Sequence, residues 1–201
     1  HMLFGSYYAM PFPAWLQKKV EEDPDMLLIS GDGLQVESRQ VGAEGKTIND
    51  GMNINHPFIQ QYARESVEAL AKQFGQDTAY VVAGWEDNNI LHLPGVTSGN
   101  GYRTVGYNPT GIKAFREYLA SRYENIAELN TRWKTDYASF SVVDPPADKW
   151  LIPASEAGGL TYEWERFSRM NHLAYSRLLK KAYHAGSPET PVMIDDSHFL
   201  L

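Results

Sequence analysis

The pattern of apolar residues divides the chain into strands and helices that alternate. Two continuous apolar runs, Leu3–Met10 and Ala79–Trp85, are typical of buried strands, and Pro191–Ile194 predicts a third near the end of the sequence. A short strand is also expected at Met26–Ser30, inside a long loop rich in Gly, Asp, Asn and Ser that runs from Asp23 to Asn55. A second, Gly-rich loop is expected at Leu93–Tyr107.

Helices fill most of the sequence between these strands. Asn55 and Pro57 are start signals for a helix that Gly75 ends, and Asn108-Pro109 starts another. The predicted helical segments are 14–16, 55–75, 108–119, 126–133 and 161–184. Their apolar residues recur at helical spacing, and those expected on the buried stripes are Ile59, Tyr62, Ala63, Ser66, Val67, Leu70, Phe74, Ile112, Phe115, Tyr118, Leu119, Ile126, Leu129, Trp133, Trp164, Phe167, Ala174 and Leu178.

This order of elements predicts an α/β fold. Apolar strands that alternate with helices form a parallel sheet with the helices outside it, joined by right-handed connections. The chain has 201 residues, 43% of them apolar, which is enough for one packed core, so we expect residues 3–201 to be a single domain. His1-Met2 has the form of a cloning remnant, so the sequence leaves the native compartment open.

Composition excludes several classes of partner. The net charge of -7 argues against nucleic acid, which is bound by clustered Lys and Arg. No apolar run reaches about 18 residues, so we expect a soluble protein with no membrane-spanning segment. The chain has no Cys, and its six His residues show no metal-binding spacing, so neither a metal nor another cofactor is expected.

Polar residues gather where the predicted strands end. The carboxyl ends of parallel strands carry the functional site in α/β folds, and here they select Pro11–Trp15, Glu86–Asn89 and Asp195–His198. Carboxylates at such a place are suited to glycoside hydrolysis, in which one acid protonates the leaving oxygen. The alternative is that these residues form turns or, for Asp195 and Asp196, cap a following helix.

Five segments, in order, resemble glycoside hydrolase family 42, which includes β-galactosidases built on a (β/α)8 barrel. They are Pro11–Leu16, similar to the family's PPAWL segment; Asn55–Pro57 with Tyr62–Arg64 and Glu68–Ala71; Gly84–Asn88, similar to a strand ending in W-x-x-D-N-E; Ala114–Leu119 with Arg122-Tyr123 and Leu129–Trp133, similar to F-x-x-W-L-x-x-[RK]-Y…L-N-x-x-W; and Trp164–Phe167. The helix-pair motif is the most specific of these matches. The resemblance implies an incomplete TIM-type barrel running from about the third strand to the fifth.

The same resemblance assigns roles at the predicted site. The family's acid/base Glu corresponds to Asn89, and an amide cannot exchange a proton near neutral pH. Glu86 is therefore the candidate replacement acid, because the chain is one residue shorter here than the family pattern. The residues expected to bind a carbohydrate are Trp15, Trp85, Asp87, Asn88, Asp195 and Asp196. The family's nucleophile, a Glu after the seventh strand, lies outside this sequence.

Three functions remain open at this point. In the first, the parent protein is a glycoside hydrolase. In the second, it is a sugar-binding derivative that has lost catalysis, as Asn89 in place of the acid/base Glu indicates. In the third, the chain is a piece of a barrel that binds no ligand by itself. Three parallel strands also leave two open sheet edges, which favour pairing with another chain. We therefore expect either self-association through the strand edges or a closed arrangement that differs from the family's.

Overall fold

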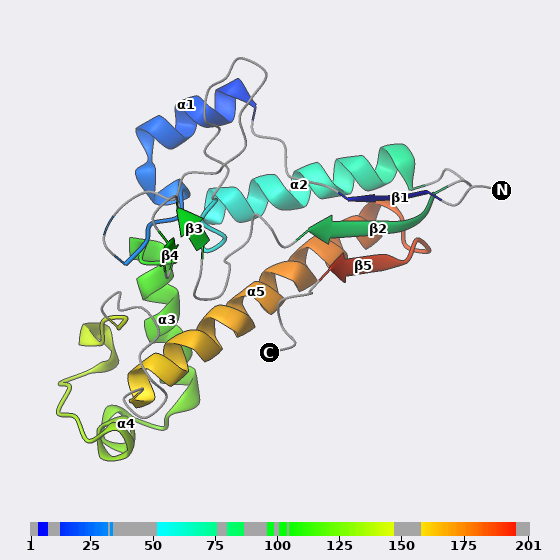
Figure 1. Ribbon diagram of the computed structural model, residues 1–201. Helices are drawn as coiled ribbons and strands as arrows, with labels where there is room; N and C mark the ends of the chain where they lie inside the picture. The colour runs from blue at the N-terminus through cyan, green and yellow to red at the C-terminus, as the bar shows by residue number, and fades with distance from the viewer. Residues whose placement is uncertain are drawn as a thin grey trace.

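The structure is a computed structural model. It describes residues 4–7, 13–31, 33, 52–75, 80–86, 96–98, 101–103, 105–146 and 158–195. The helices and strands in these ranges form a parallel sheet with two long helices, a helical lobe at one end of the longest helix, and a smaller group that contains α1 (Figure 1).

Three strands form the parallel sheet. β1 (Phe4–Tyr7), β2 (Tyr80–Glu86) and β5 (Val192–Asp195) pair in the order β1-β2-β5, and their arrows point the same way in Figure 1. Helix α2 (Pro57–Phe74) comes between β1 and β2 in sequence, and α5 (Gly159–Gly186) comes between β2 and β5. This is the parallel sheet with outer helices that the alternating pattern predicts.

The two long helices pack on one another through a shared apolar core. Its buried members are Leu28, Ile54, Ala63, Val67, Ala71, Val105, Tyr175, Leu179, Ala182 and Tyr183. The end of α5 approaches α2 so closely that a Cβ on Gly186 would lie 2.6 Å from the carbonyl oxygen of Glu68 and 2.8 Å from the Cβ of Ala71. Only a residue without a side chain fits there, so Gly186 fixes the crossing point of the two helices.

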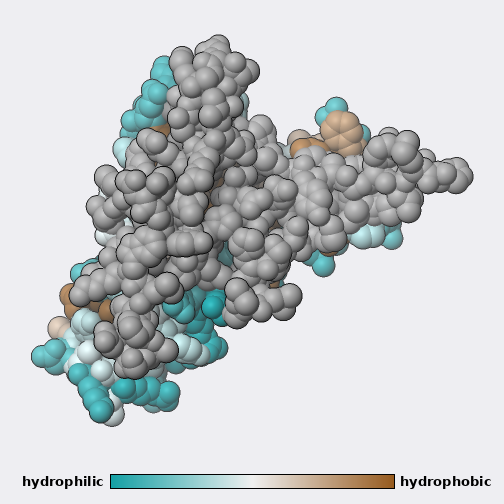
Figure 2. Space-filling model, viewed as in Figure 1, coloured by the Kyte–Doolittle hydropathy of each residue, from teal (hydrophilic) through white to brown (hydrophobic). Residues whose placement is uncertain are grey.

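A helical lobe packs against the N-terminal half of α5. It contains α3 (Pro109–Arg122), α4 (Ile126–Trp133) and the 3-10 turn η3 (Phe140–Val142). Its buried core is formed by Phe115, Leu119, Tyr123, Leu129, Val143, Trp164 and Phe167. The described surface of this lobe is mostly hydrophilic in Figure 2, as expected for helices that bury one stripe only.

Local signals explain where the lobe's helices begin and end. Pro109 is the first residue of α3, where a missing N–H costs nothing. The Asn125 side chain caps α4 by accepting a hydrogen bond from the Glu128 N–H at 3.0 Å. Lys134 ends α4 in a left-handed conformation with φ 58°. The predicted inward positions Phe115, Leu119 and Leu129 are fully buried, which confirms that part of the pattern.

Three of the predictions for the loops were wrong. The brief turn at 14–16 is the start of a nine-residue helix, α1 (Ala14–Glu22), which buries Leu16 and Val20. Met26–Ser30 is no strand: a 3-10 turn, η1 (Pro24–Met26), is followed by two isolated bridges to Met52 and Val105. The predicted loop at 93–107 contains an antiparallel hairpin of β3 (Val96–Ser98) and β4 (Gly101–Arg103), whose short polar strands lack an apolar alternation.

Details of the long helices also differ from the prediction. His56, and not Asn55, is the cap of α2: its Nδ1 accepts a hydrogen bond from the Phe58 N–H at 3.2 Å. Phe74, predicted on the buried stripe of α2, is 43% exposed. Ala174 is exposed as well, since the buried stripe of α5 passes over Tyr175 instead.

The outer edges of the parallel sheet are relevant to the predicted self-association. β1 and β5 each pair with β2 alone among the described strands, so each has an unpaired edge within that set. Self-association through these edges stays a prediction. None of the helices in the described ranges is long and apolar enough to cross a membrane.

Candidate active site

Two acidic residues end neighbouring strands of the parallel sheet. Glu86 is the last residue of β2 and Asp195 the last residue of β5, and the two are partners in the pairing register. The sequence placed Glu86 after its strand, but pairing with β5 extends β2 through this position. β1 ends two residues earlier in the register, with Tyr7 opposite Gly84. The carboxyl edge of the sheet therefore brings together Glu86 and Asp195, as the strand-end rule predicts.

Other predicted site residues are distributed differently. Trp85 lies within β2, opposite Ile194 of β5. Asp87, Asn88, Asn89 and Asp196 lie outside the described residues. Their roles stay predictions, and so does the role of Glu86 as an acid.

Trp15 lies in the first turn of α1, on the chain segment that follows β1. Half of its surface is exposed, while the neighbouring Leu16 is fully buried. Two rings of α2 hold the indole edge-on: the ring centroids are 6.4 Å from Phe58 and 5.4 Å from Tyr62, at interplanar angles of 82° and 83°. The Lys19 ammonium lies 5.0 Å from the centre of the Phe58 ring. Burial raises the pKa of the Tyr62 phenol, so this group is neutral at ordinary pH.

Two buried asparagines join three loop segments beside this aromatic group. Asn108 is fully buried: its Oδ1 accepts from the Ile29 N–H at 2.9 Å, and its amide nitrogen donates to the carbonyls of Leu27 and, at 3.2 Å, Asp25. Asn53, also fully buried, donates to the Asp25 carbonyl at 2.7 Å and to the hydroxyl of Thr110 at 2.6 Å. These contacts connect segments 25–29, 53 and 108–110, which are far apart in sequence.

The cap of α2 ties the same segments to the helix. Because the Nδ1 atom of His56 accepts from the backbone, its Nε2 carries the proton and lies 3.2 Å from the Asp23 carboxylate. Gln60 donates to the Ile54 carbonyl at 2.8 Å. The loops after β1 are therefore held against the start of α2 by side-chain hydrogen bonds.

A buried carboxylate, Glu163, organises the helical lobe. The Tyr118 hydroxyl donates to its Oε2 at 2.7 Å, and the Tyr123 hydroxyl donates to its Oε1 at 3.1 Å. The Arg122 guanidinium lies 3.4 Å from Oε1, and the Trp133 indole N–H donates to the Tyr123 hydroxyl at 3.1 Å. Glu163 is only 3% exposed, so these partners offset the cost of burying its charge.

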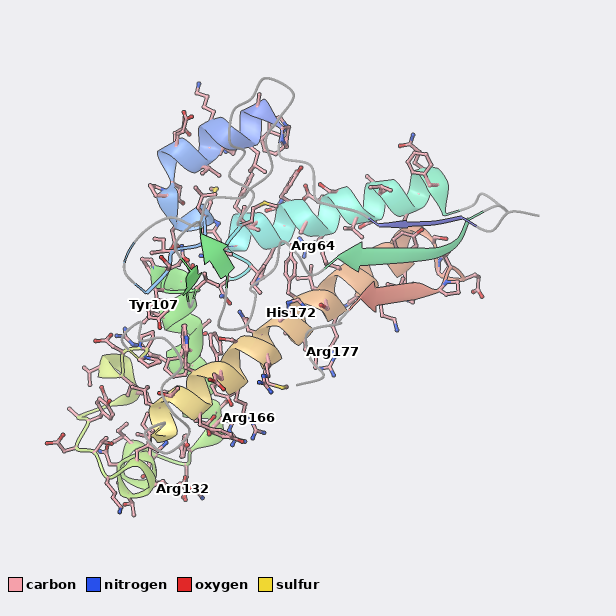
Figure 3. All side chains as sticks on the ribbon, viewed as in Figure 1. Arg64, Tyr107, Arg132, Arg166, His172 and Arg177 are labelled. Carbon is pink, nitrogen blue, oxygen red and sulfur yellow. The ribbon has the colours of Figure 1, made fainter. Side chains whose placement is uncertain are left out.

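The environment of Glu163 changes the acidity of its tyrosine partners. Burial, followed by the hydrogen bond to Glu163 and its negative charge, raises the pKa of Tyr118 well above its usual value. Burial also raises the pKa of Tyr123. Figure 3 places Arg132 on α4 at the lower end of the lobe, and its guanidinium lies 5.8 Å from the centre of the Tyr123 ring. Both phenols therefore stay neutral donors and fix the carboxylate.

The geometry offers carboxylate chemistry at the sheet edge and stacking chemistry at Trp15. Across the described residues, no three His, Cys, Asp or Glu side chains are grouped so as to hold a metal ion. Glu163 and Asn53 were not singled out in the sequence, and Asn108 was named there only as part of a helix start signal. The contacts that join these residues to other segments are distant along the chain or on another helix, and such pairings leave no local pattern.

Comparison with known proteins decides the family. The profile of glycoside hydrolase family 42, described as beta-galactosidase, matches residues 9–198. The chain belongs to glycoside hydrolase family 42. It is 30% identical over 172 residues to the beta-galactosidase BgaH of Haloferax lucentense. The aligned region covers 83% of this chain and 22% of BgaH. The chain thus spans about a quarter of the length of the relatives it matches.

Solved structures support the same fold. The beta-galactosidase of the psychrophilic Marinomonas ef1 superposes with a TM-score of 0.67 at 19% identity, covering 96% of this chain and 26% of that one. The catalytic domain of the beta-amylase from Paenibacillus polymyxa gives a TM-score of 0.67 at 16% identity, covering 93% of this chain and 45% of that one. These are TIM-barrel structures, so this family 42 chain has the fold of part of such a barrel.

The family motif that is most specific in sequence has a structural role here. Tyr118, Arg122 and Tyr123 all contact Glu163, and Trp133 contacts Tyr123. The helix-pair motif of family 42 thus encodes the lobe around one buried carboxylate, and its residues belong to the lobe and not to the sheet edge.

Proposed function

We propose that this chain forms one side of the active-site mouth of a family 42 glycoside hydrolase that cleaves β-galactosides. The observation that carries the proposal is the register of Glu86 and Asp195, which end adjacent parallel strands in a chain of this family. Strand ends of this kind carry the catalytic groups of TIM-barrel enzymes. The relatives named beta-galactosidase support the choice of substrate.

Glu86 is the proposed acid that protonates the leaving glycosidic oxygen. Asn89 stands where the family has its acid/base Glu, and its amide can hydrogen-bond that oxygen without giving up a proton. Asp195 is the register partner of Glu86, so the same edge of the sheet has a second acidic residue. The nucleophile expected from the family pattern lies outside this sequence.

The remaining predicted residues are proposed to bind the sugar. Aromatic rings stack on the apolar face of a sugar ring, while carboxylate and amide groups hydrogen-bond its hydroxyls. The proposed ligand-binding residues are Trp15, Trp85, Asp87, Asn88, Asp195 and Asp196.

A second candidate function is sugar binding without turnover. It is favoured by Asn89, because loss of the family's acid/base Glu removes about 100-fold to 10,000-fold of general-acid catalysis unless another group replaces it. On this alternative the mouth keeps its stacking and hydrogen-bonding groups but does not cleave the bond.

Hydrolysis of aryl β-galactosides separates the two candidates. The assay uses the full-length parent protein, its Glu86→Gln and Asn89→Glu variants, and Glu65→Gln on the exposed face of α2 as a matched control. We expect Glu86→Gln to lower kcat about 100-fold or more, Asn89→Glu to raise it, and Glu65→Gln to leave it unchanged.

Calorimetric titration of the same proteins with galactose and galactosides completes the test. Binding without turnover in every variant except Asn89→Glu supports the sugar-binding alternative. Equal kcat in the parent protein and Glu86→Gln would exclude Glu86 as the acid. Absence of both turnover and binding would contradict both functions.

A further inference from the structure

We propose that the exposed side of α5 binds an anionic polysaccharide, one that carries sulfate or carboxylate groups along its length. The cations of this surface, which we call the basic face, are Arg166, Arg169, Arg177, Lys180 and Lys181. The choice of a polysaccharide rests on the proposed function, because the ligand is a charged form of the same class of substrate. The net charge of the basic face, its lack of ion pairs in the described structure, and its arrangement carry the inference.

The basic face concentrates positive charge in an acidic chain. From Arg166 to Lys181 the sequence contains five cations and no Asp or Glu. The whole chain has a net charge of -7, so the basic face is opposite in sign to the protein as a whole. A local charge of this kind attracts an anionic partner to one place on the surface.

Cations on the other helices are paired with carboxylates. On α2 the Lys72 ammonium lies 2.6 Å from Glu68, and on α4 the Arg132 guanidinium lies 2.8 Å from Glu128. Within the described ranges, none of the five cations of the basic face forms an ion pair. The anions of a ligand would therefore displace no acidic side chain when they bind there.

Folding of α5 does not account for these cations. Like charges three or four residues apart on a helix repel, and Arg166 with Arg169, and Arg177 with Lys181, have these spacings. The helix dipole favours cations in the last turn only, whereas Arg166 and Arg169 are in the N-terminal half of α5. The basic face therefore destabilises the helix, and a ligand that neutralises it would remove that repulsion.

The cations form two groups on one side of the helix. Arg166 and Arg169 form the first group, and Arg177 and the two lysines that follow it form the second. Arg166 and Arg177 are 11 residues apart, which is about 17 Å along the helix. Figure 3 shows both on the same side of α5, turned away from α2. A linear polyanion can contact both groups at once, which favours a polymer over a small anion.

Side chains next to the cations suit a sugar ring. Tyr162 is 57% exposed, and its hydroxyl accepts a hydrogen bond from the Arg166 guanidinium at 3.4 Å. Met170 and Leu173, between the two groups, are 46% and 36% exposed. An aromatic ring can pack on the apolar face of a sugar, while guanidinium groups bind sulfate or carboxylate with two hydrogen bonds. The basic face thus combines contacts for the sugar with contacts for its charge.

The test compares two forms of one polymer, a β-linked galactan and the same galactan after chemical sulfation. Binding of each to the unaltered chain is measured by isothermal calorimetry at low salt. Polygalacturonate, which has carboxylates in place of sulfates, identifies the preferred anion. Poly-glutamate and duplex DNA are polyanions of other classes and test whether the basic face selects a carbohydrate.

Two triple variants test the residues of the basic face. The first removes three of its charges and combines Arg166→Gln, Arg169→Gln and Arg177→Gln. The matched control removes three exposed charges from other helices or their ends and combines Lys18→Gln, Lys113→Gln and Lys134→Gln. Both change the net charge equally, so a difference between them reports the position of the charges. Circular dichroism of each variant verifies that the helices remain folded.

We expect the sulfated galactan to bind more tightly than the unmodified polymer, and the gain to decrease as salt is added. The triple variant of the basic face should weaken binding of the sulfated galactan about 10-fold or more, and the control less than about 2-fold. Lysine at the same three positions should retain part of the affinity, since it keeps the charge but not the paired hydrogen bonds.

Three results would overturn the inference. In the first, the sulfated galactan and polygalacturonate bind no more tightly than the unmodified galactan. In the second, the two triple variants lose equal affinity. In the third, poly-glutamate or duplex DNA binds as tightly as the anionic polysaccharides, because the basic face would then attract any polyanion.

Failure of the proposed function has a separate readout. Hydrolysis of aryl β-galactosides by the full-length parent protein, and binding of galactose, use uncharged ligands. If neither occurs while the sulfated galactan still binds through the basic face, the proposed function is wrong and the charged surface stands. If galactosides are bound or cleaved and the sulfated galactan gains nothing, the proposed function stands and the basic face is wrong.

Discussion

The N-terminal half of α5 and the strand β5 that follows this helix hold their acidic residues in different settings. Glu163, on α5, is buried in the lobe and contacts two tyrosine hydroxyls and an arginine. Asp195 ends β5 at the open edge of the sheet, in register with Glu86. The sequence motif that resembles the family best belongs to the first setting, whereas the acidic residues proposed for the active site belong to the second.

This contrast separates what identifies the family from what performs its chemistry. The lobe needs particular residues because each hydroxyl and charge around Glu163 must find its partner in a buried place. On the proposed function, the residues at the carboxyl ends of the strands are constrained by the ligand and the reaction instead. A chain can therefore be recognised by the family's lobe whatever groups stand at its strand ends.

The largest effect is expected from removing the carboxylate of the lobe. Glu163→Ala leaves the hydroxyls of Tyr118 and Tyr123 without their acceptor and Arg122 without its counter-charge. Breaking a buried charged network by removing one partner costs about 3–5 kcal/mol, which we expect as the loss in free energy of unfolding by urea. Glu165→Ala, on the same helix, is the control and should change this free energy by less than about 0.5 kcal/mol. An equal loss in both variants would contradict the role of Glu163.

A smaller loss is expected where the loops are joined. Asn108→Ala removes the acceptor of the Ile29 N–H and the donor to the carbonyls of Leu27 and Asp25. Unsatisfied buried backbone groups cost about 1–3 kcal/mol each, so we expect unfolding to be about 2–4 kcal/mol easier by urea denaturation. Proteolysis within segment 25–29 should become faster.

Asn171→Ala provides the matched control for the loop prediction. Considering the described part of the chain, the buried amide nitrogen of Asn171 has no hydrogen-bond partner. Its removal should change the free energy of unfolding by less than about 1 kcal/mol. If it costs as much as Asn108→Ala, the asparagine contacts do not account for the stability of the loops.

The bounds of a helix could be predicted from the sequence where a local start or stop signal was present. Pro109 and Gly75 are local signals, and α3 and α2 begin or end within a residue or two of them. The stripe of α5 was harder, because the helix changes partners along its length: Trp164 faces the lobe and Tyr175 faces α2. A single periodic stripe therefore placed Ala174 inside, although it is exposed.

The site was predictable only as far as topology governs it. That Glu86 and Asp195 share one edge follows from parallel strands, but their register depends on how β2 and β5 pair. The contacts by which Asn53 and Asn108 join the loops left no signal, since those partners lie between 28 and 83 residues away. The exposure of Trp15 was equally hidden, because Leu16 beside it is just as apolar and fully buried.

An intermediate loss of stability is expected when the N-terminal cap of α4 in the lobe is removed. Asn125→Ala removes the cap of α4, whose Oδ1 accepts from the Glu128 N–H, and should cost about 1 kcal/mol of unfolding free energy. Asn125→Ser restores a capping oxygen and should recover most of that loss. Urea midpoints of the two variants measure it. If neither variant loses stability, the cap does not contribute to the stability of the lobe.

The smallest effect is absent at neutral pH and develops in alkaline solution. Burial raises the pKa of Tyr175 in the α2–α5 core, and burial with Glu163 raises the pKa of Tyr118 in the lobe. Below pH 10 both phenols are protonated in the folded and unfolded chains, so stability does not depend on them. Above pH 10 the unfolded chain releases these protons and the folded chain keeps them, so the free energy of unfolding decreases as pH rises.

Urea unfolding between pH 8 and 11.5 measures this slope, and two variants divide it between the cores. Tyr175→Phe should reduce the slope without touching Glu163, whereas Tyr118→Phe should reduce it and also lower stability at neutral pH, because Glu163 loses a donor. A stability that stays level to pH 11 would show that neither phenol is held neutral by the fold. If Tyr118→Phe changes the slope but not the neutral stability, the hydrogen bond to Glu163 contributes nothing, and the contrast between the lobe and the sheet edge then rests on burial alone.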